Sequence, residues 1–321
     1  MRIIIDTDPA MGTVGGDPED GLAIMLALNS PEVDVLGITI VQGNAPAEMG
    51  YSNARHLLTL MGRGDVPLLR GCLRPMSSTR TTQIKLLERR YELKQITVAV
   101  EPPAGDADAV SFLIDTVRAK PSDITLVTIG PLTNVATAIQ KSQAFTEALR
   151  GVVMMGGTVA CAGNITPAAE FNFWQDPEAA DVVFRSGVPL TMVGLDVCNK
   201  TRLLPEQVEE RAAGGSDLGQ FVLEAAMPWF RAMAATEGRE GLHLYDSLAM
   251  AVAIDSSLVE LDECYVEIDA GDRAAQGMSV AFRKPFQRWL IGNPEPNAHV
   301  ALDVHVDRFG DVFNAKVLDR I

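Results

Sequence analysis

The repeated order of a short apolar run and a helix-like run is the feature that most limits the fold of this chain. Strands and helices that alternate in this way form parallel β-α-β units with right-handed crossovers. The apolar runs are nearly continuous, as in strands that are covered on both faces. We therefore predict an α/β fold, a mostly parallel open sheet flanked by helices, in one domain over residues 1–321. The predicted strands are RIIID (2–6), VDVLGITIV (33–41), SDITLVTIG (122–130), RGVVMMGG (150–157) and VPLTMVGLDV (188–197), and the predicted helices are 18–30, 46–62, 131–141 and 176–187.

Polar and glycine-rich motifs follow the carboxyl ends of the predicted strands. They are DTDP (6–9), VQGN (41–44), TIGPLTN (128–134) and MMGG (154–157). Open α/β sheets bind their ligands outside the carboxyl ends of the strands. We therefore expect these motifs to form one crevice, although they are far apart in the sequence.

Charge and cysteine content narrow the function classes. A net charge of -15 argues against binding to nucleic acid or to an anionic membrane, both of which attract basic surfaces. The four cysteines contain no CxxC pair, and no secretory leader precedes the first strand. No run approaches the roughly 18 apolar residues that span a bilayer. We expect a soluble, cytoplasmic protein with a small-molecule substrate.

Five acidic residues gather where the first strand ends: Asp6, Asp8, Asp17, Glu19 and Asp20. Carboxylates at this density repel one another unless a cation lies among them. Hard divalent cations such as Ca²⁺ and Mg²⁺ prefer oxygen ligands. The stretch therefore predicts a metal site, whose remaining ligands come from distant parts of the chain.

The whole set of motifs resembles the inosine-uridine-preferring nucleoside hydrolases. DTDP, VQGN, TIGPLTN, MMGG, GNITPAAEFNFWQDPEAA and YDSLA occur in the order of that family and at comparable spacing. The resemblance implies Ca²⁺-dependent hydrolysis of the N-glycosidic bond of ribonucleosides to free base and ribose. It also implies a homo-oligomer, a dimer or a tetramer.

The resemblance implies a set of metal ligands and a general base. Asp8, Asp20 and Asp246 would bind Ca²⁺ through carboxylates and Ile129 through its backbone carbonyl. Asp8 would also take a proton from the attacking water. Asp6 would lie behind these ligands or at the ribose, with a carboxylate that binds nearby backbone amides as the alternative.

The resemblance also implies the residues that bind the sugar. Asn44, Asn164, Glu170 and Asn172 match ribose-binding positions, with Met155 lining the pocket. Phe171 would pack beside the base or belong to the core.

The first acidic motif departs from the family pattern. The segment PAMGTVGGDPEDG is longer than usual and contains Glu19 before Asp20 instead of an aspartate pair. Glu19 would bind a ribose hydroxyl, and Asp17 is an alternative source of charge. The glycines of the insertion indicate a segment that bends back on itself instead of forming a helix or strand.

The residue before the last metal ligand is Tyr245, where family members have His or Trp. A tyrosine stacks on a base and can donate a proton, although its ordinary pKa near 10 makes it a reluctant acid. His243 titrates nearer neutrality, and a solvent-facing loop histidine is the alternative. Both are candidate leaving-group acids.

Two segments are candidate lids over the crevice: residues 74–103 and residues 234–245. A solvated surface loop and helix is the alternative for the first. Two other functions stay open on sequence alone. One is a catalytically weak, calcium-dependent nucleoside- or ribose-binding protein, and the other is a haloacid dehalogenase-like phosphatase, which the DTD motif suggests.

Overall fold

The structure is a computed structural model that describes residues 1–76, 95–100, 108–271, 273–283 and 294–321. Its strands form one nine-stranded sheet in the order β3-β2-β1-β4-β5-β6-β9-β7-β8. All neighbours from β3 to β9 pair in parallel, and β7 and β8 add an antiparallel edge. The predicted α/β fold with a mostly parallel sheet is confirmed.

The five predicted strands are present in the sheet, together with four others. The strands are β1 (Arg2–Thr7), β2 (Asp34–Ile40), β3 (Leu68–Arg70), β4 (Ile124–Thr128), β5 (Gly151–Met155), β6 (Leu190–Val193), β7 (Val259–Ile268), β8 (Ser279–Phe282) and β9 (Ala298–Val304).

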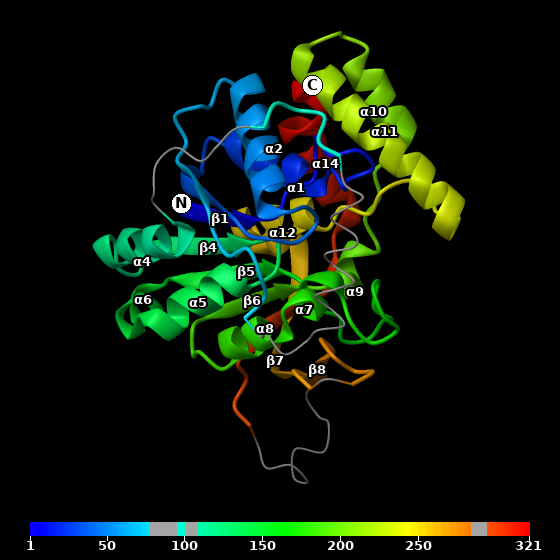
Figure 1. Ribbon diagram of the computed structural model, residues 1–321. Coiled ribbons are helices and arrows are strands. Elements are labelled where there is room, and N and C mark those ends of the chain that lie inside the picture. The colour runs from blue at the N-terminus through cyan, green and yellow to red at the C-terminus, as the bar shows by residue number, and fades with distance from the viewer. Residues whose placement is uncertain (77–94, 101–107, 272, 284–293) are drawn as a thin grey trace.

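Helices cover both faces of the sheet (Figure 1). The first group of helices comprises α1 (Glu19–Leu28), α2 (Ala47–Leu60), α11 (Asp217–Glu237), α12 (Asp246–Ile254) and α14 (Val306–Lys316). The second group comprises α4 (Ala109–Ala119), α5 (Thr133–Lys141), α6 (Gln143–Ala148) and α8 (Pro177–Phe184). The shorter α7 (Phe171–Gln175), α9 (Leu195–Cys198) and α10 (Pro205–Ala212) complete the α-helices that the structure describes, and two 3₁₀ helices lie at Ser256–Leu258 and Leu318–Arg320.

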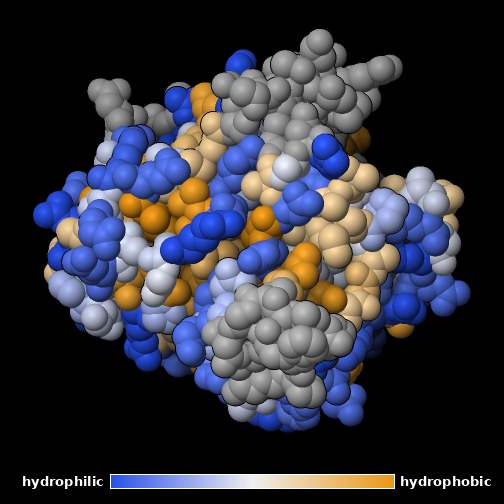
Figure 2. Space-filling model, turned by 90° about the horizontal axis from the view of Figure 1, so that it is seen from below, coloured by the Kyte–Doolittle hydropathy of each residue, from blue (hydrophilic) through white to orange (hydrophobic). Residues whose placement is uncertain are grey.

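Two hydrophobic clusters lie on opposite faces of the sheet because successive side chains of a strand alternate between its faces. In β1, Ile3 and Ile5 pack with the first group of helices, and Ile4 packs with the second group. All three side chains have no exposed surface. The outer surface mixes hydrophilic residues with smaller hydrophobic areas on the face seen in Figure 2.

The structure corrects one strand boundary. The predicted strand 188–197 ends at Val193, and Leu195–Cys198 form the short helix α9. Gly194 separates the two. Its carbonyl accepts hydrogen bonds from the amides of Val197 and Cys198, and these bonds form the first turn of α9.

The glycine-rich insertion bends back as predicted, and it also pairs with a distant segment. Gly12 and Gly15 have φ angles of 105° and 60°, in the region that favours glycine. The amide of Val14 donates to the carbonyl of Gln95 at 2.7 Å, and the amide of Thr97 donates to the carbonyl of Gly12 at 2.8 Å. The insertion is thereby tied to the end of the first candidate lid.

Most of the first candidate lid, residues 77–94 and 101–103, lies outside the described residues. The second, residues 234–245, begins as the last turn of α11, which ends at Gly238 in a left-handed conformation. Among the described residues, no helix has the length and apolar content that crossing a membrane requires.

Candidate active site

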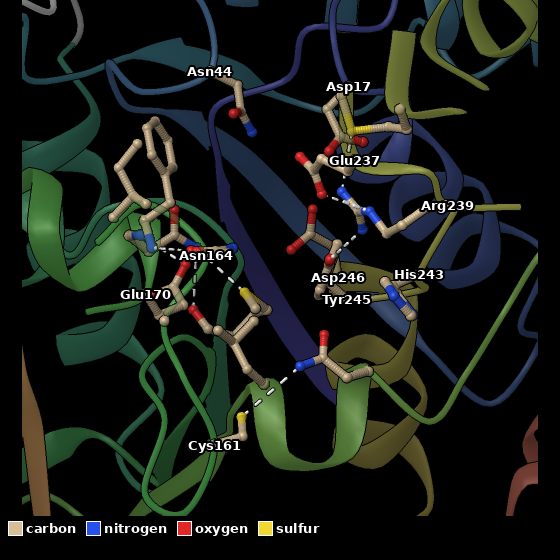
Figure 3. Close-up of a pocket in the computed structure, with 18 of the residues that line it drawn as sticks. Asp17, Asn44, Cys161, Asn164, Glu170, Glu237, Arg239, His243, Tyr245 and Asp246 are labelled. Carbon is tan, nitrogen blue, oxygen red and sulfur yellow. Dashed lines mark hydrogen bonds and ion pairs between the residues drawn. The ribbon is translucent and has the colours of Figure 1, made fainter. Parts of the chain in front are cut away.

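A pocket of about 560 Å³ lies at the carboxyl ends of the parallel strands (Figure 3). This volume falls in the usual range for small-molecule sites. The residues after β1, β2, β4 and β5 meet the beginning of α12 and the end of α11 there, as the crevice prediction requires. Of the residues predicted from the sequence, its lining contains Asp17, Asn44, Ile129, Met155, Asn164, Glu170, Phe171, Asn172, His243, Tyr245 and Asp246.

Asp8 lies at the end of β1 with no exposed surface. Its Oδ2 accepts a hydrogen bond from the amide of Asn44 at 2.6 Å. Two glycines leave room for this carboxylate: a Cβ on Gly43 would lie 1.8 Å from Oδ2, and one on Gly130 would lie 2.6 Å from Oδ1. Side chains at these two positions would therefore displace Asp8.

Asp20, in the first turn of α1, is fully buried beside Asp8. Its Oδ1 accepts from the Thr7 hydroxyl at 2.6 Å and from the Asp8 amide at 3.1 Å. Its Oδ2 accepts from Nδ2 of Asn44 at 3.3 Å. DTDP, VQGN and the beginning of α1 therefore meet at one point, behind the residues that line the pocket.

The structure is at odds with the predicted ribose contact of Glu19. Oε2 of Glu19 accepts from the amides of Asp246 at 2.9 Å and Ser247 at 3.2 Å. Oε1 accepts from the Ser247 hydroxyl at 2.9 Å. The side chain is 1% exposed and does not line the pocket, so it binds the N-terminus of α12 and holds Asp246. Asp17, the alternative, does line the pocket.

The buried carboxylates raise one another's affinity for protons. Burial raises the pKa of Asp246 well above its usual range, and the charges of nearby carboxylates, Asp20 first, add to the rise. Burial, with Asp17 second, raises the pKa of Glu19 to about 8. Burial also raises the pKa of Asp20. The region at and behind Asp246 thus carries an excess of acidic groups that positive charge would relieve.

Glu170 and Asn172 hold the opposite wall through the backbone. Glu170 accepts from the amides of Gly157 at 2.9 Å, Asn172 at 2.7 Å and Phe173 at 3.2 Å. Its burial raises its pKa to about 7. Nδ2 of Asn172 donates to the carbonyls of Ile129 and Met155, both at 3.2 Å. Together these bonds fix the wall against β4 and β5.

Asn164 and Phe171 extend this wall into the pocket. Oδ1 of Asn164 accepts from the amide of Phe171 at 2.9 Å, and Asn164 is exposed. Phe171 is partly buried and lines the pocket. Phe171 therefore does not belong to the buried core, and its place beside the base stays a prediction.

Asp6 lies beneath the pocket and does not line it. Its Oδ1 accepts from the Thr39 hydroxyl at 2.5 Å and from Nδ2 of Asn134 at 2.7 Å. Asn134 also accepts from the amide of Cys72 at 2.8 Å. The predicted contact of Asp6 with ribose is therefore not supported, and its hydrogen bonds join β1 and β2 to the TIGPLTN motif.

Tyr245 and His243 line the wall that carries the end of α11. Burial raises the pKa of Tyr245 above its ordinary value, so its hydroxyl keeps its proton near neutral pH. Burial lowers the pKa of His243, whose Nδ1 lies 2.9 Å from the carbonyl of Thr201. This contact fits a neutral imidazole ring whose Nδ1–H donates a hydrogen bond to the Thr201 carbonyl. His243 is half-buried in the pocket wall and does not face solvent as the alternative expected.

Sequence reasoning missed the α11 side of this wall. Trp229, Met233, Glu237 and Arg239 line the pocket. Trp229 lies in an apolar helical stretch that equally fits a core position. Arg239 belongs to the candidate lid 234–245, and that assignment was the one signal for it in the sequence.

The described residues contain no ready-made cluster of three His, Cys, Asp or Glu side chains around a common metal position. Asp8, Asp20 and Asp246 nevertheless supply only oxygen atoms, as does the carbonyl of Ile129. Oxygen-only donors with excess negative charge fit a hard divalent cation by their chemistry.

Comparison with known proteins places the chain in a family. The sequence profile described as inosine-uridine preferring nucleoside hydrolase matches residues 3–311. An uncharacterized protein of Schizosaccharomyces pombe is 33% identical over 97% of this chain and 97% of that protein. The pyrimidine-specific ribonucleoside hydrolase RihB of Escherichia coli is 31% identical over 96% of this chain and 94% of that protein.

Solved structures agree with the sequence relatives. The purine-preferring ribonucleoside hydrolase from Gardnerella vaginalis has a TM-score of 0.85 and 30% identity, over 99% of this chain and 98% of that one. These matches exclude the phosphatase alternative, because the same fold and motifs run through the whole chain. They also favour an enzyme over a protein that only binds. The chain therefore belongs to the inosine-uridine preferring nucleoside hydrolase family and is an N-glycosyl hydrolase.

Proposed function

We propose that the chain hydrolyses the N-glycosidic bond of ribonucleosides in a Ca²⁺-dependent reaction in which Asp8 is the general base. The observation that carries this proposal is the gathering of three buried carboxylates: Asp246 lines the pocket, and Asp8 and Asp20 lie behind the lining, close enough for their charges to raise the pKa of Asp246. The family consists of metal-dependent hydrolases. A single domain, a homo-oligomer and a cytoplasmic location stay predictions.

Asp8, Asp20, Asp246 and the carbonyl of Ile129 would hold the ion. The raised pKa values of Asp20 and Asp246 support this set, because a bound cation favours the charged form of each carboxylate. Ca²⁺ tolerates flexible geometry with six to eight oxygens, whereas Mg²⁺ demands a near-ideal octahedron. When bound, Ca²⁺ supplies positive charge that makes a nearby water more acidic and attracts sugar hydroxyls.

The sugar would lie between Asn44 and the wall that carries Asn164 and Glu170. These side chains lie around the pocket in Figure 3. Amide and carboxylate groups match the hydroxyls of ribose as hydrogen-bond partners. Because the wall is fixed to β4 and β5, it would hold C1′ still for attack along one line.

The Asp8 carboxylate would take the proton of the attacking water as the bond between C1′ and the base breaks. Its position is set by the Asn44 amide and by Gly43 and Gly130. Hydrolysis of such bonds passes through an oxocarbenium-like transition state, which the buried carboxylates would stabilise electrostatically. The base would leave toward Tyr245 and His243, where the protonated hydroxyl of Tyr245 can donate a hydrogen bond.

Release of free sugar from a panel of ribonucleosides tests the proposal. The panel contains purines and pyrimidines, because the named relatives differ in their preference. We expect release that stops with a chelator and returns with added Ca²⁺. Release that is unchanged after complete removal of metal would contradict the calcium dependence. Absence of release from every nucleoside, with Ca²⁺ present, would contradict the hydrolase function.

A further inference from the structure

The pocket wall opposite Asn164 and Glu170 carries the cationic side chain of Arg239 (Figure 3). Nη1 of Arg239 donates to the Tyr245 hydroxyl at 3.1 Å, and Nη2 contacts Sδ of Met233 at 3.0 Å. Nε lies 2.7 Å from Oε2 of Glu237 in an ion pair. The side chain of Arg239 is 24% exposed, so it is largely withdrawn from solvent. These contacts hold the guanidinium in one orientation beside Tyr245.

The guanidinium keeps donors for a ligand. Each terminal nitrogen carries two N–H groups, and the contacts with Tyr245 and Met233 use one on each. Glu237, the paired carboxylate, is half-exposed, and water therefore screens its charge. Arg239 can thus direct both charge and hydrogen bonds into the pocket.

Trp229 offers a second donor on the same side of the pocket. Its indole nitrogen is buried and has no hydrogen-bond partner among the residues that the structure describes. Buried N–H groups usually have a partner, so an indole without one in a pocket lining points to an acceptor on a ligand. Amide and acid groups suited to ribose gather on the other wall, and the α11 wall therefore suits the base.

Resting on the proposed function, we propose that Arg239 is a leaving-group residue that stabilises the departing base, with Trp229 as a second hydrogen-bond donor to that base. Water bonds to C1′, and its proton goes to Asp8. The C1′–N bond breaks and its electron pair stays on the base. The base is then an anion until it takes a proton from solvent, and the Arg239 guanidinium stabilises that anion by charge and hydrogen bonding.

Comparison of two kinds of substrate tests this role in the Ca²⁺-loaded enzyme. Natural nucleosides have poor leaving groups, whereas p-nitrophenyl β-D-ribofuranoside releases a nitrophenolate that is stable as an anion. For Arg239→Gln we expect kcat/KM to fall roughly 10²–10³-fold with inosine and uridine, and less than about 5-fold with the nitrophenyl riboside. For Trp229→Phe, which keeps the ring, we expect about a tenfold loss confined to the nucleosides.

Two further variants control for charge and folding. Arg239→Lys keeps the charge, and we expect it to keep more nucleoside activity than Arg239→Gln. Arg231→Gln changes an exposed arginine of α11, the helix that precedes Arg239, and should leave both substrates unaffected. Equal losses with both substrates in the Gln and Lys variants of Arg239, or full nucleoside activity in Arg239→Gln, would overturn the proposal. If the wild-type enzyme hydrolysed neither substrate, the proposed function itself would fail.

Discussion

Replacement of Glu19 separates its role at the N-terminus of α12 from the role in ribose binding that the sequence suggested. Glu19→Ala removes the acceptor of the Asp246 and Ser247 amides, which lie in the buried first turn of α12. A buried donor left without a partner costs about 1–3 kcal/mol, so two such donors set the loss at roughly 2–6 kcal/mol. Removal of a buried carboxyl with a pKa of about 8 offsets part of this loss. We therefore expect Glu19→Ala to lower the free energy of unfolding by about 3 kcal/mol.

Glu19→Gln is the matched variant. Both backbone amides donate to the same oxygen of Glu19, so one carboxamide oxygen can accept both bonds. The carboxamide NH₂ can donate to the Ser247 hydroxyl, which now donates to Oε1. We expect Glu19→Gln to cost less than about 1 kcal/mol.

Urea unfolding with a chelator present measures both variants without any contribution from a bound ion. A calorimetric Ca²⁺ titration of the same proteins then reports on Asp246, and we expect Glu19→Ala to bind the ion more weakly than Glu19→Gln. Equal stability losses in the two variants would refute the capping argument. So would a Glu19→Ala protein as stable as the wild type.

Three more predictions concern the proposed chemistry and the pH dependence of stability. Asp8→Asn should lower kcat by roughly 10²–10⁴-fold, with an unchanged urea midpoint because its amide oxygen can still accept from Asn44; normal steady-state rates would contradict the base role. Tyr245→Phe should slow hydrolysis of natural nucleosides more than that of the nitrophenyl riboside, and equal rates for the variant and the wild type would remove the hydroxyl from the reaction. Burial raises the pKa of Glu170 from 4.5 to about 7, so the folded state holds that proton more tightly and the free energy of unfolding should fall as pH rises across this interval. Glu170 contributes about 3 kcal/mol of this fall, and Glu170→Gln should remove that share in chelator-treated protein and leave the share of other buried carboxyls such as Glu19; an unchanged slope in the variant would show that Glu170 contributes nothing.

The sequence was sufficient for the fold class and for the location of the pocket. The apolar centres III of RIIID and VVMM of RGVVMMGG are continuous instead of alternating with polar residues, as expected for strands that are covered on both faces. Parallel strands place their carboxyl ends at one edge, so Asn44, Ile129 and Met155 were expected together, and all three line the pocket. These conclusions depend on the local pattern of apolar residues and on the order of strands and helices, both of which can be inferred from the sequence.

The direction of individual side chains was decided by contacts between distant segments. Glu19 follows the acidic motif, but its carboxylate turns to α12, 227 residues away, because that helix presents amides that need an acceptor. Asp6 lies in the same motif, yet Thr39 and Asn134 bind its carboxylate beneath the pocket.

The wall formed by α11 depends wholly on the tertiary structure. The stretch AAMPWFRAM (225–233) was predicted to be helical, and no local pattern shows that Trp229 within it, or Arg239 in the candidate lid after it, faces a pocket. The packing of α11 against α10 and α2 places Trp229 in the pocket lining, and the turn after α11 brings Arg239 beside Tyr245. The sequence by itself thus determined the fold class, five strands of the sheet and the edge that carries the site. Tertiary packing alone decided which carboxylates line the pocket and which hydrogen-bond donors lie on its opposite wall. The direction of a side chain is set by contacts with distant segments, which the local sequence does not contain.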